Sequence, residues 1–257
     1  MKVVLLAGGH GTRLSEETVL RPKPMVEIGG RPILWHIMKY YAHFGHNEFI
    51  VCCGYKGYVI KEYFANYFLH QSDVTFDLKE NQMEIHNSST ENWKVTLVDT
   101  GLDSQTGHRI KRIEKYIDDT FMLTYGDGVS NVDINALVDF HKSHGKVGTM
   151  TSFRPEGRFG ILDIDSTNKK VNRFVEKPKG DGNWINAGFF VFEKEFFKYL
   201  DDRQDLILER EPLEGLTSDG QLHTYQHEDF WKCMDTLRDR QQLEKIWSTK
   251  APWKVWE

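Results

Sequence analysis

The strongest constraint on the fold is a short apolar run near the start of the chain that leads directly into a glycine-rich loop. The run, residues 3–7, contains no polar side chain, which is typical of a strand buried on both faces of a parallel sheet. The loop, residues 8–14, reads GGHGTRL. Its glycines let backbone N–H groups approach an anion, and Arg13 adds a permanently charged fork suited to phosphate oxygens. We predict an anion-binding loop, with an ordinary turn as the alternative.

Neither of two well-known phosphate-binding loops matches residues 8–14. The dinucleotide-binding fingerprint requires a third glycine where Leu14 stands, and the P-loop requires Gly-Lys-Ser/Thr after four intervening residues. A basic residue nearby strengthens the phosphate interpretation. Lys23 lies between two prolines, which hold its backbone extended. It is a candidate phosphate ligand, with an exposed lysine in a proline turn as the alternative.

Strand and helix patterns alternate along the first half of the chain. The apolar periodicity predicts a helix over residues 33–44, a strand over 48–53 and a helix over 57–69. This order implies right-handed crossovers and a mainly parallel sheet. The interval 74–98 is expected to form short strands with a hairpin or an edge excursion. A helix is also predicted over residues 109–117. From residue 147 onward the chain is β-rich. Its last part is expected to contain helices near 194–200 and 205–219, a helix over 236–247, and an aromatic tail that packs on the body or on a neighbouring subunit. We expect one domain over residues 1–257.

The composition excludes several classes of protein. A net charge of −5 with interspersed acidic and basic residues argues against a general nucleic-acid binder. No apolar run is long enough to span a membrane, and the first one is too short for a signal peptide. The three cysteines form no CxxC pair, and the adjacent Cys52 and Cys53 are expected to point to opposite faces of a strand. We predict a cytoplasmic protein with reduced cysteines.

Three polar motifs follow predicted strands and are candidates for chemistry. Asp127 follows the strand predicted over residues 121–125, and ligands of open α/β sheets bind at such carboxyl ends; a turn or a helix N-cap is the alternative. The motif Glu176-Lys177-Pro178 could bind a sugar phosphate, or be exposed surface. Asp235 precedes the helix predicted from Thr236 and could bind a metal, or cap that helix.

In this order along the chain, the glycine loop, Lys23, Asp127, the Glu-Lys-Pro motif and Asp235 resemble the sugar-nucleotide pyrophosphorylases. These nucleotidyltransferases join a nucleoside triphosphate to a sugar 1-phosphate. The resemblance is strongest to the members of this family that use CTP, and it then extends over nearly the whole chain. One departure is His108, which occupies a position where those members have a glycine. It implies a Rossmann-like α/β fold: a mixed, mainly parallel central sheet flanked by helices, with a β-rich sugar-binding part and a C-terminal helical segment.

The resemblance also implies an activity. The expected substrates are CTP and glucose 1-phosphate, the expected cofactor is Mg²⁺, and the product CDP-glucose would supply surface polysaccharide synthesis. The sugar-phosphate oxygen would attack the α-phosphorus and release pyrophosphate. The first alternative is a pyrophosphorylase for another base or sugar, such as UTP or dTTP with glucose 1-phosphate. A metal-dependent glycosyltransferase would favour an Asp-x-Asp motif, whereas Asp127 stands alone between two glycines. A non-catalytic regulatory protein with this domain is a further alternative. Relatives are generally oligomers, so a homo-oligomer is expected, with no nucleic-acid or membrane partner.

Residue roles carried over from the resemblance divide into four sets. The catalytic set is Arg13, Lys23 and Asp127. The nucleotide-binding set is Leu6, Ala7, Gly8, Gly9, His10, Gly11, Thr12, Arg13, Lys23, Ser104, Arg109 and Asp127. The sugar-phosphate-binding set is Gly160, Glu176, Lys177 and Asn186, and the metal ligands are Asp127 and Asp235. Residues 1–130 would form mainly the nucleotide part, 131–235 mainly the sugar-phosphate part, and 236–257 the C-terminal helix and tail.

Overall fold

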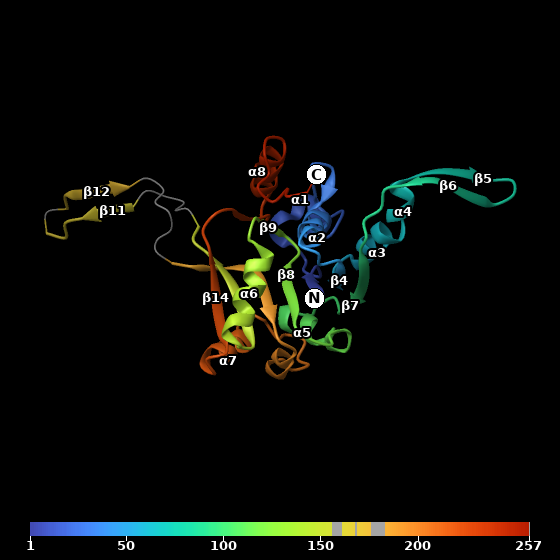
Figure 1. The fold of residues 1–257 in the computed structure, drawn as a ribbon. Helices are drawn as coiled ribbons and strands as arrows, with labels where there is room; N and C mark the ends of the chain where they lie inside the picture. Colours follow the sequence, from blue (N-terminus) through green and yellow to red (C-terminus); the bar gives the residue numbers. More distant parts are fainter. Residues whose placement is uncertain (156–160, 168, 176–182, 257) are drawn as a thin grey trace.

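A seven-stranded mixed sheet forms the centre of the computed structural model, which describes residues 1–155, 161–167, 169–175 and 183–256 (Figure 1). Its strands, in spatial order, are β14 (Leu222–His227), β10 (Gly148–Phe153), β13 (Ile185–Phe192), β8 (Phe121–Tyr125), β1 (Val3–Leu6), β4 (Glu48–Cys53) and β7 (Lys94–Asp99). Only β13 runs antiparallel to its neighbours in this sheet; the other pairs are parallel. The predicted mixed, mainly parallel sheet is confirmed.

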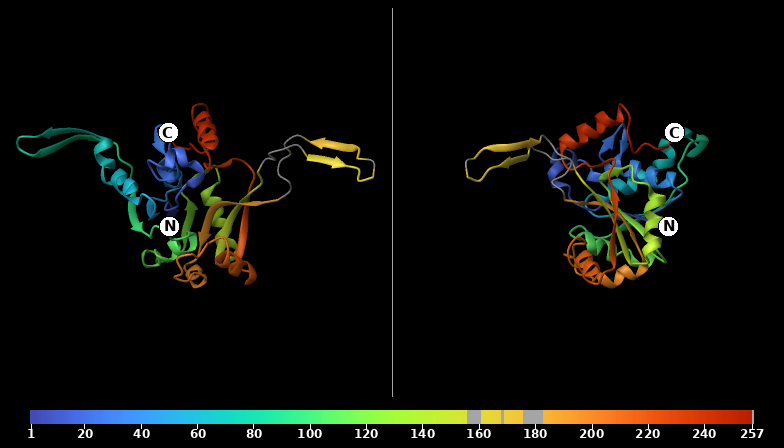
Figure 2. Two further views of the ribbon diagram at one scale, coloured as in Figure 1. Left: turned by 180° about the vertical axis from the view of Figure 1, so that it is seen from behind. Right: turned by 60° about the vertical axis from the view of Figure 1, so that its left-hand side comes forward.

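Helices cover both faces of this sheet, as Figure 2 shows from two further directions. The helices of the described residues are α1 (Ser15–Thr18), α2 (Ile33–His43), α3 (Gly57–Ala65), α4 (Tyr67–His70), α5 (Thr106–Lys111), α6 (Ile134–His144), α7 (Glu211–Ser218) and α8 (Leu237–Trp247). Along β1 the side chains alternate between two hydrophobic clusters, one with Val3 and Leu5 and the other with Val4 and Leu6. The uninterrupted apolar run is therefore buried on both faces, as predicted.

Three predicted helices have different bounds in the structure. The helix predicted over residues 57–69 is interrupted at Asn66, whose backbone leaves the helical region and whose side chain donates to the Glu62 carbonyl. The helix predicted over 205–219 begins only at Glu211, just before Pro212, a residue suited to a first helical turn. The helix predicted over 109–117 begins earlier, at Thr106, and ends at Lys111, before a short 3₁₀ turn at Glu114–Tyr116.

The interval 72–99 forms a hairpin and an edge strand. Strands β5 (Ser72–Asp77) and β6 (Gln82–Ser88) pair with each other and project from the body as an arm, at the right in Figure 1. The chain then returns to the central sheet as β7. Two more short antiparallel pairs are β2 (Glu27–Ile28) with β3 (Arg31–Pro32), and β11 (Ile161–Ile164) with β12 (Val171–Val175).

The aromatic tail packs on the body of the chain. Trp253 is buried, with its ring stacked near Phe230 and Trp247. The tail thereby covers apolar surface beside α2 and α8, one of the two arrangements expected for it. All three cysteines are free, and Cys52 and Cys53 belong to opposite clusters. Within the described part of the chain, no helix has the length and apolar character needed to cross a membrane.

Candidate active site

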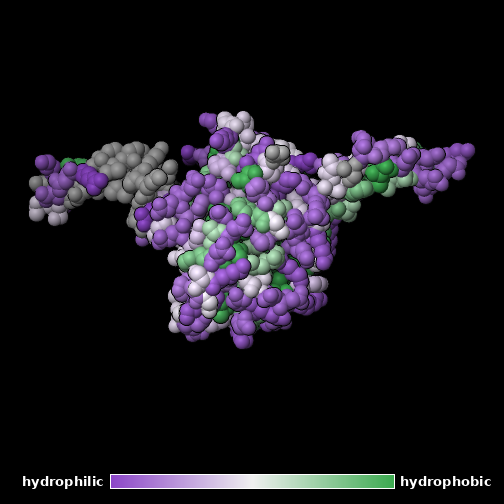
Figure 3. All heavy atoms as spheres, viewed as in Figure 1, coloured by the Kyte–Doolittle hydropathy of each residue, from purple (hydrophilic) through white to green (hydrophobic). Residues whose placement is uncertain are grey.

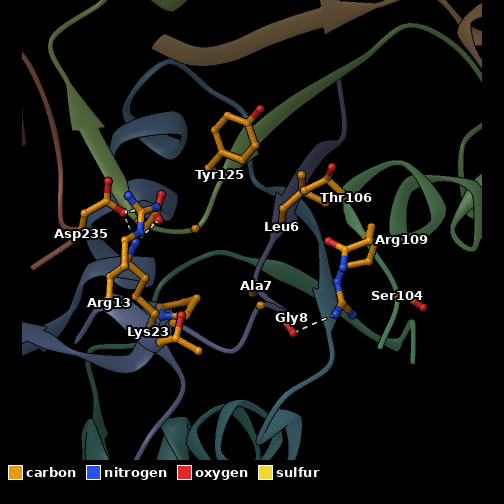
Figure 4. Close-up of a pocket in the computed structure, with 17 residues that line it drawn as sticks. Leu6, Ala7, Gly8, Arg13, Lys23, Ser104, Thr106, Arg109, Tyr125 and Asp235 are labelled. Atoms are coloured by element: carbon orange, nitrogen blue, oxygen red, sulfur yellow. Dashed lines mark hydrogen bonds and ion pairs between the residues drawn. The ribbon is translucent and has the colours of Figure 1, made fainter. Parts of the chain in front are cut away.

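A pocket opens at the carboxyl ends of β1 and β8. From β1 the chain moves outward to β4 and β7, then returns to the other side of β1 as β8, and open α/β sheets bind ligands at such a reversal. The lining residues (Figure 4) are Leu6, Ala7, Gly8, Gly9, Gly11, Thr12, Arg13, Lys23, Pro24, Ser104, Gln105, Thr106, Arg109, Tyr125, Gly126, Asp127 and Asp235. The structure thus gathers most of the predicted site residues around one cavity.

The glycine loop forms one wall of this pocket. Gly11 adopts a left-handed backbone (φ +64°) that favours glycine, and it precedes the 3₁₀ turn Thr12–Leu14 that carries Arg13. Gly126, at the end of β8, lies so close to β1 that a Cβ atom there would be 2.8 Å from the Leu6 carbonyl oxygen. Two loops of small residues therefore meet at the pocket.

Two three-residue strands bring the predicted metal ligands together. Strand β9 (Gly128–Ser130) pairs antiparallel with β15 (Trp231–Cys233), and Cys233 lies opposite Gly128. The Met234 N–H group donates to the Asp127 carbonyl at 2.8 Å. Asp127 and Asp235 flank this pair, so segments from distant parts of the chain place both carboxylates in one wall of the pocket. These two strands were not predicted.

Neither aspartate caps a helix. Asp133 caps α6 by accepting from the Ala136 N–H group at 3.0 Å. Thr236 caps α8 in a reciprocal capping box with Asp239. The structure therefore excludes the N-cap alternatives for Asp127 and Asp235.

Lys23 bridges the two carboxylates. Its Nζ atom donates to Asp127 Oδ2 at 2.5 Å and to Asp235 Oδ1 at 2.7 Å. Arg13 Nη2 lies 3.0 Å from the same Asp235 oxygen, as the dashed lines in Figure 4 show. The Lys23 side chain is only 12% exposed, whereas that of Arg13 is 73% exposed. Lys23 is thus held between two carboxylates, whereas Arg13 pairs with one of them and remains largely exposed at the pocket.

Two opposing effects set the pKa values of Lys23 and Asp235: burial disfavours their charged forms, and pairing with opposite charges favours them. Burial works to lower the pKa of Lys23, but Asp127 and then Asp235 raise it above its usual value. Burial works to raise the pKa of Asp235, but the hydrogen bond and charge of Lys23, with the charge of Arg13, hold it below its usual range. The lysine is therefore cationic and Asp235 anionic near neutral pH.

The donor set fits a hard cation that completes its coordination with phosphate oxygens. Two carboxylates converge on one point, and the described residues hold no cluster of three or more His, Cys, Asp and Glu able to bind a metal. Mg²⁺ is usually held by one or two carboxylates, substrate phosphates and waters. Asp127 and Asp235 are sufficient for such a site, and zinc-type ligand sets are absent from the described residues.

The loop that follows β7 forms the opposite wall, where Ser104 lies. Its Oγ atom donates to the Thr100 carbonyl at 2.5 Å and lies 2.9 Å from His108 Nδ1. His108 Nε2 is 3.2 Å from Asp202 Oδ1. The histidine thus supports the serine from behind, without lining the pocket itself.

Several predicted site residues lie away from the pocket or outside the described residues. His10 does not line the pocket, and its ring centroid is 5.1 Å from that of Tyr55. Asn186 also lies outside the lining, and its Nδ2 atom donates to the Tyr125 hydroxyl at 3.2 Å. The predicted sugar-phosphate ligands Gly160, Glu176 and Lys177 fall outside the described residues.

Tyr125 and Thr106 were not predicted as site residues, although both line the pocket. Both hydroxyls donate to Glu209, that of Thr106 at 2.8 Å. Burial raises the pKa of Tyr125, so its hydroxyl stays protonated. The position of Tyr125 directly before Gly126-Asp127 was the available sequence signal, whereas nothing near Glu209 indicated its role.

Fold and site together define a nucleotidyltransferase. The family model described as "Nucleotidyl transferase" matches residues 2–239, so the chain belongs to this family. Glucose-1-phosphate cytidylyltransferase of Salmonella typhi is 58% identical over 260 residues, covering 100% of both chains. A probable glucose-1-phosphate cytidylyltransferase of Bacillus subtilis is 42% identical over 258 residues, again covering 100% of both. These relatives confirm the predicted membership of the pyrophosphorylases.

The solved structure of HddC from Yersinia pseudotuberculosis resembles this chain in three dimensions. The two are 25% identical, with a TM-score of 0.68, and the match covers 96% of this chain and 99% of that one. The predicted Rossmann-like architecture is thereby confirmed.

Proposed function

We propose that this chain is a glucose-1-phosphate cytidylyltransferase, which converts CTP and glucose 1-phosphate into CDP-glucose and pyrophosphate. The observation that carries the proposal is the cluster of Lys23, Arg13 and two aspartates at the glycine loop. Full-length likeness to the Salmonella typhi enzyme supports the choice of base and sugar. The three free cysteines are consistent with a cytoplasmic enzyme.

The first task of such a site is to offset the repulsion between two polyanionic substrates. Two unit charges about 4 Å apart interact by roughly 4 kcal/mol at an effective dielectric constant near 20. In our proposal Lys23 neutralises the α-phosphate region and the exposed Arg13 holds the β- and γ-phosphates that leave. Lys177, outside the described residues, holds the phosphate of the sugar. Three cations thus divide the charge of the reacting groups.

The glycine loop and the loop at Ser104 would hold the nucleotide. Leu6 to Thr12 contribute backbone and small side chains, and Ser104 lies across the pocket near the expected position of the base. Glu176, Asn186 and Gly160 remain candidates for the glucose hydroxyls. We retain the proposed division into a nucleotide part (1–130), a sugar-phosphate part (131–235) and a C-terminal helix and tail (236–257).

The reaction needs positioning and charge stabilisation rather than a covalent intermediate. An oxygen of the sugar phosphate attacks the α-phosphorus of CTP, and the bond from that phosphorus to the pyrophosphate oxygen breaks. The attacking oxygen is already ionised, so no side chain has to remove a proton. We propose that Asp127 and Asp235 hold Mg²⁺, which supplies Lewis-acid stabilisation of phosphate charge when bound.

Pyrophosphate release from purified protein tests the proposal. Glucose 1-phosphate and Mg²⁺ are held constant while CTP, UTP, dTTP, ATP and GTP are compared. The fastest turnover with CTP, and CDP-glucose as the isolated product, are expected. Faster turnover with UTP or dTTP would reassign the base. No turnover with any of the five would contradict the catalytic proposal in favour of a regulatory protein.

We further propose that the chain forms a homo-oligomer through the β5–β6 arm. A two-stranded hairpin alone is marginally stable in water, yet this one extends from the body with Phe76, Leu78 and Met83 exposed. Figure 3 shows green apolar side chains on the arm among polar ones. Light scattering should show a larger mass for the wild type than for a variant with Phe76→Ser and Leu78→Ser. An unchanged mass would exclude the arm as the interface.

A further inference from the structure

The guanidinium of Arg109 is buried at the junction of three loops. The side chain comes from α5, and the residue is 4% exposed although it borders the pocket. Its Nη atoms lie within hydrogen-bond distance of five oxygens: Nη1 of Gly101 O (2.6 Å), Thr100 Oγ1 (2.8 Å) and Cys53 O (3.4 Å), and Nη2 of Gly8 O (2.9 Å) and Leu102 O (3.1 Å). Gly8 lies in the loop that follows β1, Cys53 is the last residue of β4, and Thr100, Gly101 and Leu102 lie in the loop that follows β7.

The donor count leaves Arg109 little capacity for a substrate phosphate. Each Nη atom carries two hydrogens, and each has at least two protein oxygens as acceptors. The acceptors are mainly backbone carbonyls, which need partners when buried. Figure 4 shows the guanidinium turned toward Gly8, away from Lys23 and Arg13. The Arg109 guanidinium therefore binds oxygens of the protein itself and has few hydrogens left for a ligand.

Two glycines make room for this guanidinium. A Cβ atom on Gly8 would lie 2.3 Å from Arg109 Nη1. One on Gly54 would lie 2.4 Å from the same atom and 2.6 Å from the Gly8 carbonyl oxygen that Arg109 binds. Neither glycine has a positive φ, so the backbone conformation does not require glycine at these positions. Glycine is required there because a larger residue would collide with the Arg109 side chain. This observation is independent of the hydrogen bonds and points to the same role.

We propose that Arg109 is a positioning residue that fixes the glycine loop relative to the loop over residues 100–104. It connects Gly8, in the wall expected to hold phosphates, with Gly101 and Leu102, in the wall that leads to Ser104 near the expected base. The distance between the walls sets how well a nucleoside triphosphate fits. Arg109 therefore controls nucleotide affinity through the loops and leaves the sugar-phosphate subsite unaffected. The inference rests on the proposed function for the identity of the nucleotide.

Arg109→Lys and Gly54→Ala test this role from two sides. Lysine keeps the charge but cannot span five acceptors with one ammonium group. Alanine at position 54 keeps Arg109 but crowds both its guanidinium and the Gly8 carbonyl oxygen that it binds, from outside the pocket lining. For both variants we expect the KM and the Kd of CTP to rise, by about 30-fold for Arg109→Lys and about 10-fold for Gly54→Ala. The KM of glucose 1-phosphate should change less than about threefold.

Arg112→Lys is the matched control, since it makes the same chemical change just after α5 and outside the pocket. Its KM values should equal those of the wild type. An unchanged KM of CTP in Arg109→Lys would overturn the proposal. A rise in Arg109→Lys without a rise in Gly54→Ala would also overturn it, because the arginine would then act by direct contact. If Arg109→Lys does not fold, Gly54→Ala still tests the link between Arg109 and Gly8, and an unchanged KM of CTP in that variant would overturn the proposal.

Calorimetric binding of CTP separates failure of this inference from failure of the proposed function. If the wild type binds CTP but makes no CDP-glucose, the proposed function fails, and the ratio of Kd values still measures the effect of Arg109. If the wild type makes CDP-glucose and the variants bind CTP as tightly as it does, only the positioning role fails.

Discussion

Replacing Lys23 with methionine should leave two carboxylates facing each other without their shared cation. Lys23 Nζ lies 2.5 Å from the Asp127 oxygen and 2.7 Å from the Asp235 oxygen. These two oxygens are therefore at most about 5 Å apart. At that separation two unit charges repel by roughly 3 kcal/mol at an effective dielectric constant of about 20. About a quarter of each aspartate side chain is exposed. Solvent therefore reduces the expected loss in the free energy of unfolding to about 2 kcal/mol.

Urea unfolding with and without Mg²⁺ measures this effect. Without Mg²⁺, Lys23→Met should be less stable than the wild type by that amount. Mg²⁺ should stabilise the variant more than the wild type, because a cation between the carboxylates then has no ammonium to displace. Lys2→Met is the control, since Lys2 pairs with the exposed Asp118 away from the pocket, and such surface pairs contribute about 0–1 kcal/mol. Equal stability of the wild type and Lys23→Met, or an equal response to Mg²⁺, would show that Lys23 does not offset the repulsion between Asp127 and Asp235.

Acidification supplies a second test of the same cluster. The pKa of Asp235 lies below its usual value of 3.8 in the folded protein, mainly because Lys23 opposes the effect of burial. Its ionised form therefore stabilises the fold at neutral pH, and this contribution is lost as the pH falls below about 4 and through the lowered pKa. In Lys23→Met the pKa of Asp235 should rise, so the variant should lose less stability than the wild type over this range.

Three further substitutions test other parts of the account. Asp127→Ala should abolish Mg²⁺-dependent turnover while circular dichroism shows a folded protein; unaltered turnover would exclude Asp127 as a metal ligand. Lys177→Ala should raise the KM of glucose 1-phosphate more than that of CTP, and equal increases would count against its proposed role. Trp253→Ala should lower the free energy of unfolding by about 3–5 kcal/mol, because a fully buried ring is lost. A loss below about 1 kcal/mol in urea would show that the tail does not stabilise the body.

The architecture was predictable where the signal is local. The buried run at residues 3–6 and the amphipathic pattern of α2 follow from the order of apolar residues, and both elements form close to their predicted bounds. The loop between β1 and α1 was also recognisable from its glycines. The break at Asn66 was missed because the apolar pattern continues across it and a polar side chain ends the helix.

The convergence of the site could be predicted only in part. The resemblance to the pyrophosphorylases identified both aspartates as metal ligands. Their proximity depends on the pairing of β9 with β15, and these strands are too short to show an alternation of apolar and polar residues. The bridge from Lys23 follows from that pairing. The role of Arg109 was even less accessible, because its acceptors are mainly backbone carbonyls in two loops that are far apart in the sequence. Hydrogen bonds to backbone carbonyls depend on the path of the backbone and not on residue type, so they could not be recognised in the sequence.

Metal binding in the presence of nucleotide tests the central claim most directly. Mn²⁺ replaces Mg²⁺ and is titrated by electron paramagnetic resonance into the wild type, Asp127→Asn and Asp235→Asn, each with CTP. We expect one tight Mn²⁺ site per chain in the wild type and its loss in both variants, because both carboxylates are needed. Full Mn²⁺ affinity in either variant would contradict a site shared by Asp127 and Asp235.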